Sequence, residues 1–217
     1  FVDRIIRHIL NLADTNALRS LGQNLSLLAE ASPEVFVNEI LIAIEDKRVM
    51  GFFEEERGFL SPSNDLPNLL WALESIAWMP EHLTNVVRIL CKLIELQPEK
   101  LPTSNSPYNS LKRIFRIWFP LTTANLKERK QVLEILKKEY PNIAFKLFSS
   151  LVYSNSDVAF GAHKMRWRLF SETRKVSVTH QEVYNMHDYS VDSLIELTNA
   201  GDLPKALTLI DKLDDIN

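Results

Sequence analysis

The part of the chain richest in chemically active side chains is a basic stretch at residues 163–175, where aromatic rings stand among cations. Cations along an irregular segment can follow phosphates, and rings can stack on bases, so this composition suits single-stranded nucleic acid. In the alternative reading, the rings fasten a crossing segment to neighbouring helices while the cations pair with carboxylates or stay hydrated. We favour this structural reading. The candidate contact residues for nucleic acid or a partner are Lys164, Arg166, Trp167, Arg168, Arg174 and Lys175.

A second basic stretch covers residues 111–119. Its apolar residues recur at helical spacing, which predicts an inward stripe and places the cations outward. The expected role of those cations is a solvated helix face, although the two stretches together could line one groove if they met in space. The inward residues are Leu111, Ile114, Phe115 and Trp118, and the outward candidates are Lys112, Arg113 and Arg116.

Motifs for catalysis or cofactor binding are absent from the sequence, which lacks GxxxxGK[ST], HExxH, CxxC and GxSxG. His180 and His187 could share a helix face near Glu182 and Asp188, but without a third close ligand we expect solvated or capping histidines. Cys91 lies beside an apolar stripe and is expected to be a buried, inert thiol. The sequence therefore predicts no catalytic residue, no cofactor and no metal site, so we expect the chain not to be an enzyme.

The composition favours an all-α fold. The chain has 217 residues and 5 Gly, where an average domain of this length would have roughly 15. Sandwiches, barrels and dinucleotide-binding sheets need more glycine for their turns and phosphate loops. A net charge of −3 gives no overall attraction to nucleic acid or anionic lipid. No apolar run approaches a membrane span, and a single cysteine points to a reducing compartment, so we expect a cytoplasmic protein without a membrane partner.

Helix starts are marked by proline at the first helical position and by capping residues. Ser32-Pro33-Glu34 and Ser106-Pro107 are such starts, and Asn125 and Thr179 each precede a Glu at capping-box spacing. With the apolar periodicity, these signals predict helices over residues 2–13, 16–30, 33–47, 65–78, 80–96, 107–118, 126–139, 141–152, 180–199 and 203–213.

The helix predicted at 65–78 is apolar over more than half of its circumference, so it must be covered on two flanks. This pattern is typical of stacked helical pairs, and we predict an irregular α-α superhelix or solenoid of antiparallel hairpins, similar to HEAT or TPR arrays but without a fixed repeat. The expected organisation is a hairpin stack at 1–152, an irregular basic crossing segment at 153–178 and a terminal helical pair at 179–217. Because the first and last helices are already amphipathic, we expect a fragment of a larger protein.

Three segments carry a resemblance to a known kind of protein: Leu28 to Glu34 with Phe36, Leu70 to Glu74 with Trp78 and Pro80, and Asn109 to Leu111 with Trp118 and Pro120. They resemble a helical-repeat region of large bacterial multidomain proteins, which often joins a STAND-type NTPase or an effector domain and is associated with anti-phage defence. The likeness spans roughly residues 18 to 170 and rests on structural residues. It departs at Gln97-Pro98-Glu99-Lys100, where the pattern has an Asp-Pro-Gly-Gly turn.

The resemblance implies a non-catalytic helical scaffold, acting as a sensor or linker within a larger machine. Its partners would be another protein or neighbouring domains of the same chain. The alternative is a nucleic-acid-binding module that uses the basic patches at 111–119 and 163–175.

Overall fold

A computed structural model describes residues 1–54, 65–99, 105–152, 163–167, 178–198 and 205–207, and the backbone of residues 56–57 and 62–63. These residues form an all-helical protein apart from one small hairpin, in which β1 (Glu56–Arg57) pairs antiparallel with β2 (Pro62–Ser63), Glu56 opposite Ser63. The helices are α1 (Val2–Leu12), α2 (Thr15–Ser20), α3 (Asn24–Ala31), α4 (Pro33–Glu45), the 3-10 helix η1 (Arg48–Phe53), α5 (Leu66–Ile76), α6 (Pro80–Leu96), α7 (Pro107–Ile114), α8 (Leu126–Glu139), α9 (Pro141–Val152) and α10 (His180–Leu197). None of the described helices is long and apolar enough to cross a membrane.

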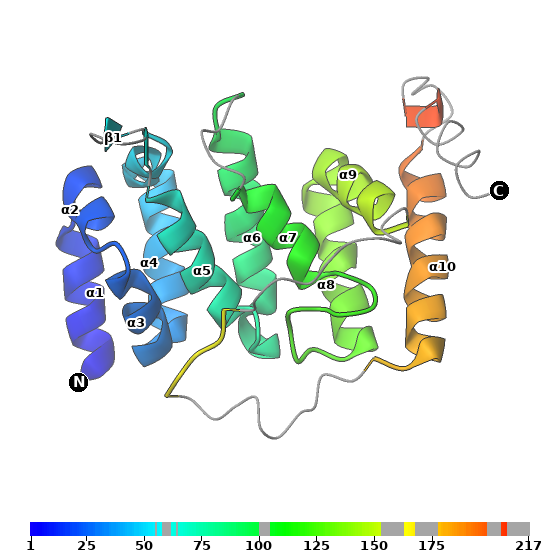
Figure 1. Ribbon diagram of the computed structural model, residues 1–217, viewed down its shortest axis with the longest axis horizontal. Coiled ribbons are helices and arrows are strands. Elements are labelled where there is room, and N and C mark those ends of the chain that lie inside the picture. The colour runs from blue at the N-terminus through cyan, green and yellow to red at the C-terminus, as the bar shows by residue number, and fades with distance from the viewer. Residues whose placement is uncertain are drawn as a thin grey trace.

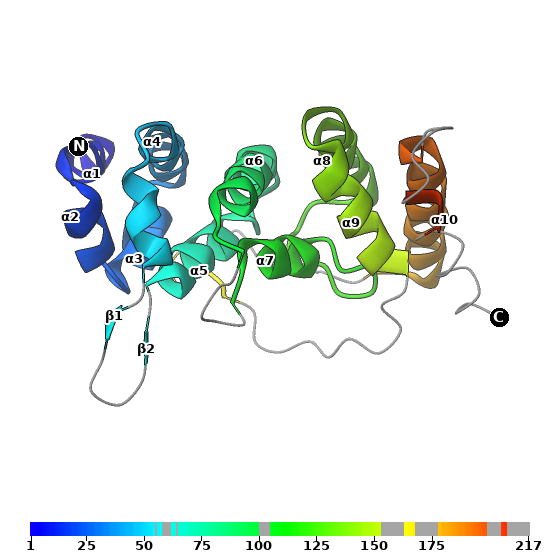
Figure 2. The same ribbon diagram turned by 90° about the horizontal axis from the view of Figure 1, so that it is seen from above.

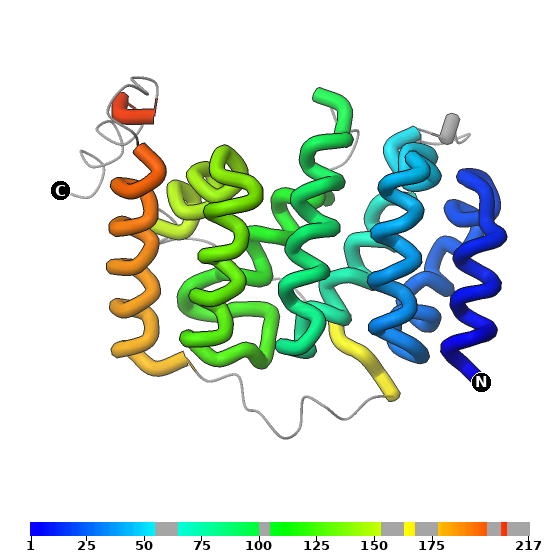
Figure 3. Tube along the Cα trace, turned by 180° about the vertical axis from the view of Figure 1, so that it is seen from behind, coloured from blue at the N-terminus to red at the C-terminus, as the bar shows by residue number. Residues whose placement is uncertain are grey.

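The helices are arranged in a row that runs from α1 at one end to α10 at the other (Figure 1). Seen from above, α1, α4, α6 and α8 form one layer, and α3, α5, α7 and α9 form the other (Figure 2). The view from behind shows the first layer, with α10 continuing it (Figure 3). Neighbouring helices within each layer contact each other. The two layers are joined by contacts of α3 with α4, of α6 with α5 and α7, and of α8 with α9. The core is therefore a continuous band between the two layers.

The starting residues of most helices behave as the sequence predicts. Proline occupies the start of α4, α6, α7 and α9. Ser106 accepts a hydrogen bond from the Asn109 backbone, and Asn125 and Thr179 each form a complete capping box. Ser32 differs, because its hydroxyl donates to Asp3 of α1 and does not cap α4. This residue links α1 to the α3–α4 junction.

Two of the predicted helices end or break early. The helix expected at 16–30 is divided into α2 and α3 by a turn at Gly22, whose φ of +46° is unfavourable for a residue with a side chain. The helix expected at 107–118 stops at Ile114. The basic segment at 153–178 is described only at 163–167 and in its final residue, which are not helical, and the last predicted helix only at 205–207, which are. The remaining residues of both lie outside the described part.

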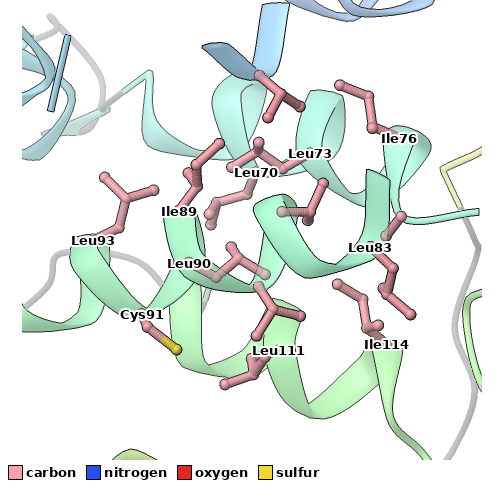
Figure 4. Close-up of a cluster of buried hydrophobic side chains, with 14 of the residues drawn as sticks. Leu70, Leu73, Ile76, Leu83, Ile89, Leu90, Cys91, Leu93, Leu111 and Ile114 are labelled. Carbon is pink, nitrogen blue, oxygen red and sulfur yellow. The ribbon is translucent and has the colours of Figure 1, made fainter. Parts of the chain in front are cut away.

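The centre of the core lies where α5, α6 and α7 meet (Figure 4). Leu73 and Ile76 of α5, Leu90 of α6, and Leu111 and Ile114 of α7 are all fully buried. Contacts of α5 with α3 on one side and with α6 and α7 on the other confirm that this helix is covered on two flanks. Since each pair is buried by its neighbours, no pair is expected to fold alone.

The last long helix, α10, is attached to α8 and α9 through Tyr189. Its hydroxyl donates a 2.7 Å hydrogen bond to Glu134 of α8, and its ring meets Phe148 of α9 edge-on at 5.8 Å. Burial is the largest cause that raises the pKa of the Tyr189 phenol above its usual value, and Glu134 raises it further. Lys137 of α8 adds an ion pair to Glu196 at 2.7 Å. These contacts fix which face of α10 points inward.

Cys91 is fully buried on α6, as the sequence predicts, and burial raises the pKa of its thiol to about 12. At pH 8 only about one thiol in 10⁴ would be ionised, and the thiolate is the reactive form. We expect no reaction of the native protein with a thiol-specific disulfide reagent at pH 8, and one equivalent of reaction in urea. Rapid labelling of the native protein would show that this part of the core opens readily.

Candidate interaction groove

Residues 163–167 form a short non-helical segment, here called the strap, that crosses α3 and the end of α5. The Trp78 indole Nε1 donates a 2.9 Å hydrogen bond to the backbone oxygen of His163. The His163 ring stacks on the Trp71 ring, with centroids 4.8 Å apart. Lys164 then places its Nζ 4.2 Å from the centre of the Trp78 ring. Two tryptophans of α5 and its following turn therefore hold the first half of the strap.

The second half of the strap is held by a buried carboxylate. Glu30 of α3 is only 6% exposed, and it accepts hydrogen bonds from the backbone N–H groups of Arg166 (2.9 Å) and Trp167. Met165, directly before Arg166, is buried against the core. Hydrogen bonds to an ionised acceptor are stronger than neutral ones. The backbone of the strap is thus fixed, while the side chains of Arg166 and Trp167 point to solvent.

A small polar network lies beneath the strap. Glu74 of α5 is 1% exposed and accepts a 2.7 Å hydrogen bond from Ser110 and a longer 3.4 Å contact from Arg113, both on α7. His163 is close enough to feel both charges. Burial is the main cause that lowers the pKa of the His163 imidazole; Glu74 raises this pKa and Arg113 lowers it. Glu74 therefore binds α7 directly, and its charge also acts on His163 of the strap.

The lowered pKa of His163 predicts that the strap weakens in acid. A folded-state pKa below the usual value of about 6.5 means that the folded protein prefers the neutral ring. This contribution is complete above pH 6.5 and is lost as the pH falls from 6.5 through the lower folded-state pKa. We expect the urea midpoint to fall between pH 7.5 and pH 5.5, and to fall less in His163→Gln. An equal fall in both proteins would assign the effect to other groups.

A groove of about 690 Å³ opens beside the strap. The groove is lined by Gln23, by Asn24, Ser26 and Leu27 of α3, by Trp71 and Ser75 of α5, and by the strap. Trp167 at its rim is 78% exposed, and Leu27 is 52% exposed. Large exposed aromatic and aliphatic side chains around a groove are typical of binding surfaces. Hydrogen-bonding groups and apolar surface are both available here.

The described residues of the two predicted basic patches have different environments. Lys164 and Arg166 are exposed, as is Trp167, so the expectation that this ring fastens the segment is wrong. Arg113 turns to Glu74, and Lys112 is partly buried. Three further candidates, Arg168, Arg174 and Lys175, lie outside the described residues.

The prediction for Arg116 and Trp118 is also wrong. Arg116 is 6% exposed and Trp118 is 43% exposed, the reverse of the expected outward cation and inward ring. Their positions follow from the end of α7 at Ile114, after which the helical phase no longer applies. The Arg116 guanidinium lies 5.3 Å from the Trp118 ring centre, so the ring covers the cation.

The two buried carboxylates near the strap, Glu30 and Glu74, were not predicted from the sequence. Glu74 carried a usable signal, because it is the single charged residue between Leu66 and Met79. A carboxylate in such an apolar helix must find a buried partner. Glu30 lies within a more polar helix, and its two backbone partners are 136 and 137 residues away in sequence. No local pattern could reveal that contact.

The described residues contain no assembled metal centre. No group of three or more His, Cys, Asp or Glu residues in that part of the chain could hold a metal ion. A second concavity of about 570 Å³ between α6 and α8 is lined by Met79, Leu83, Thr123, Glu128 and Val132, among others. Comparison with family models, curated proteins and solved structures found no match.

Proposed function

We propose that this protein is a non-catalytic helical scaffold that binds a protein segment in the groove between α3 and the strap. The observation that carries the proposal is the groove itself, where a rigid backbone presents the exposed Trp167 and Leu27 around about 690 Å³ of space. Few interface residues dominate binding energy, and a tryptophan at the rim of a groove is a typical anchor.

We further propose that the helices form an irregular α-α superhelix of antiparallel hairpins. In support, α4 contacts α1 and α6, α6 contacts α8, and α5 contacts α3 and α7, so each layer is built from neighbour-to-neighbour contacts. Arrays of this kind offer long exposed surfaces to partners, because most of each helix pair is used for stacking.

The ligand that best fits the groove is an extended acidic peptide. Lys164 and Arg166 supply positive charge at the rim, while the carboxylate of Glu30 is already occupied by backbone N–H groups. Amide and hydroxyl side chains from Gln23, Asn24 and Ser26 can pair with the peptide backbone. The resulting site would recognise the negative charge of the peptide and one of its apolar side chains.

The resemblance described above supports a wider setting for the scaffold. In that setting it is a sensor or linker module of a larger bacterial multidomain protein in anti-phage defence, and its peptide belongs to a protein partner or to a neighbouring domain. We place it in the cytoplasm, where Cys91 remains a free thiol.

Selection of a displayed library of random 12-residue peptides on the purified protein tests the proposal. Acidic peptides should be enriched, and their affinity should fall at least tenfold for a Trp167→Ala, Leu27→Ser double variant. Ile42→Ser on α4 is the matched control, because Ile42 is also exposed (39%) but does not line the groove. Peptides that bind all three proteins equally, or a library without enrichment, would contradict the proposed site.

Nucleic-acid binding is the second candidate, and the exposed group of Lys164, Arg166 and Trp167 favours it. A labelled single-stranded oligonucleotide should then bind at low salt, with an affinity that falls steeply as salt increases, since each neutralised phosphate releases counterions. Arg166→Glu should weaken binding further. No binding at low salt, or binding insensitive to salt, would remove this candidate.

A further inference from the structure

The outer face of α1 presents apolar side chains to solvent. The inward side of α1 is marked by the buried Ile6 and Leu10, which pack toward α4 and α3. Roughly 100° around the helix from these buried residues, Ile5 is 43% exposed and Leu12 is 68% exposed, with Val2 and Ile9 continuing the apolar strip. Contiguous exposed apolar side chains of this kind are typical of a surface that contacts a partner.

A basic strip runs beside the apolar strip of α1. Arg4 and His8 lie four residues apart on one helix face, and both are exposed. Neither side chain makes a hydrogen bond or ion pair with the described part of the chain. Positive charge beside apolar surface favours a partner with carboxylates in the matching place.

The outer face of α10, at the other end of the row, carries that matching pattern. Met186 and Ser190 mark its inward side. Tyr184 and Ile195 are 66% and 58% exposed on the far side. Beside them is an acidic strip of Asp188 and Asp192, four residues apart and exposed, which also make no hydrogen bond or ion pair with the described residues.

The two faces match in direction as well as in chemistry. In Figures 1 and 3, α1 and α10 run the same way at opposite ends of the row. At 3.6 residues per turn, and viewed from outside with the N-terminus down, the basic strip lies to the left of the apolar strip on α1. By the same geometry, the acidic strip lies to the right of the apolar strip on α10. When α10 of one molecule faces α1 of a second, the apolar strips therefore meet and the basic strip of α1 meets the acidic strip of α10.

We propose that copies of this chain associate head to tail, with α10 of one copy against α1 of the next. The contact is heterologous, so it generates open chains unless the rotation between copies closes a ring. Arg4 and His8 pair with Asp188 and Asp192 of the neighbouring copy, and the exposed Ile5 and Leu12 are covered by Tyr184 and Ile195.

The expected affinity is low. A helix of 11 residues is about 16 Å long, so one helix-on-helix contact buries less than the roughly 800 Å² per partner of a standard interface. We expect dissociation constants on the order of 100 µM, which is the range of weak, transient contacts. Salt should weaken the association, because the charged strips remain near solvent.

Sedimentation velocity from about 5 to 500 µM tests the proposal, using the full chain and two charge-reversed variants. Variant A is Arg4→Glu with His8→Glu, and variant B is Asp188→Lys with Asp192→Lys. The wild-type average mass should rise with concentration, while the dissociation constant of A alone or B alone should increase at least tenfold. An equimolar mixture of A and B should associate again, because each acidic α1 then meets a basic α10.

Lys127→Glu is the matched control, since it reverses an exposed charge on α8 and should associate like the wild type. Urea midpoints within error of the wild type would show that A and B are folded. Three results would overturn the proposal: a wild-type mass that stays at one chain up to 500 µM, variant B associating like the wild type (as in a symmetric α1-to-α1 contact), or no recovery in the mixture.

Discussion

Replacing Trp78 with alanine is expected to lower the free energy of unfolding by about 3–5 kcal/mol, the usual cost of emptying an aromatic core site. Trp78 is 1% exposed and is the largest of the fully buried side chains in the described residues. Its indole donates to the His163 oxygen, and its own backbone oxygen accepts from the backbone N–H and the hydroxyl of Thr123. The substitution therefore removes packing and also leaves the strap without one of its anchors.

Two controls separate these contributions in equilibrium urea denaturation. Trp78→Phe keeps most of the ring but loses the N–H donor, and should cost about 1–2 kcal/mol from the unpaired His163 oxygen and the smaller ring. Trp167→Ala removes an equally large ring that is 78% exposed, and should change stability by no more than about 0.5 kcal/mol. A Trp78→Ala protein as stable as the wild type would show that Trp78 lies outside the cooperative core.

Sequence reasoning located most helices because their signals are local. A capping box acts within one turn, so α8 and α10 begin at the predicted residues. The break at Gly22 was missed because apolar periodicity continues across it from Leu21 to Leu25. Backbone conformation at one residue can change the direction of a helix without changing the hydrophobic pattern.

Side-chain orientation after a helix end is harder to predict. Trp71 and Trp78 are seven residues apart, a spacing that would place both rings on one side of a continuous helix, but α5 ends at Ile76 and Trp78 lies in the following turn. Arg116 and Trp118 exchange their expected environments for the same reason. In both places tertiary contacts, and not helical phase, decide which side chain is buried.

For the candidate groove, the sequence indicated the basic and aromatic composition of residues 163–167 but not what holds them. Glu30 and Glu74 each satisfy donors that are distant in the chain. A buried carboxylate is unfavourable unless such donors are present. Each of these two hydrogen-bonded pairs therefore depends on two segments that are distant in sequence, and neither segment alone carries a pattern that predicts the contact. Only the fold brings them together.

Replacing Arg129 with methionine is expected to stabilise the protein, by about 1–4 kcal/mol. Arg129 is 2% exposed on α8, and its Nε and Nη1 atoms have no hydrogen-bond acceptor among the described residues. Burial lowers the pKa of its guanidinium, and the charge of Glu182 on α10 offsets this only in part. For a buried charge without good hydrogen-bond partners, the desolvation penalty is larger than the energy gained from a long-range attraction. Methionine fills a similar volume and needs no hydrogen bonds.

Arg129→Lys tests the electrostatic part of this argument, since it retains a buried charge on a slimmer side chain and should not stabilise the protein. The free energies of unfolding in urea should therefore rank methionine above both arginine and lysine. If Arg129→Met destabilises the protein by more than about 1 kcal/mol, the attraction between Arg129 and Glu182 would be stronger than the geometry implies. The attraction between the guanidinium and Glu182 would then stabilise the packing of α10 on α8, and the face that α10 presents outward would depend on it.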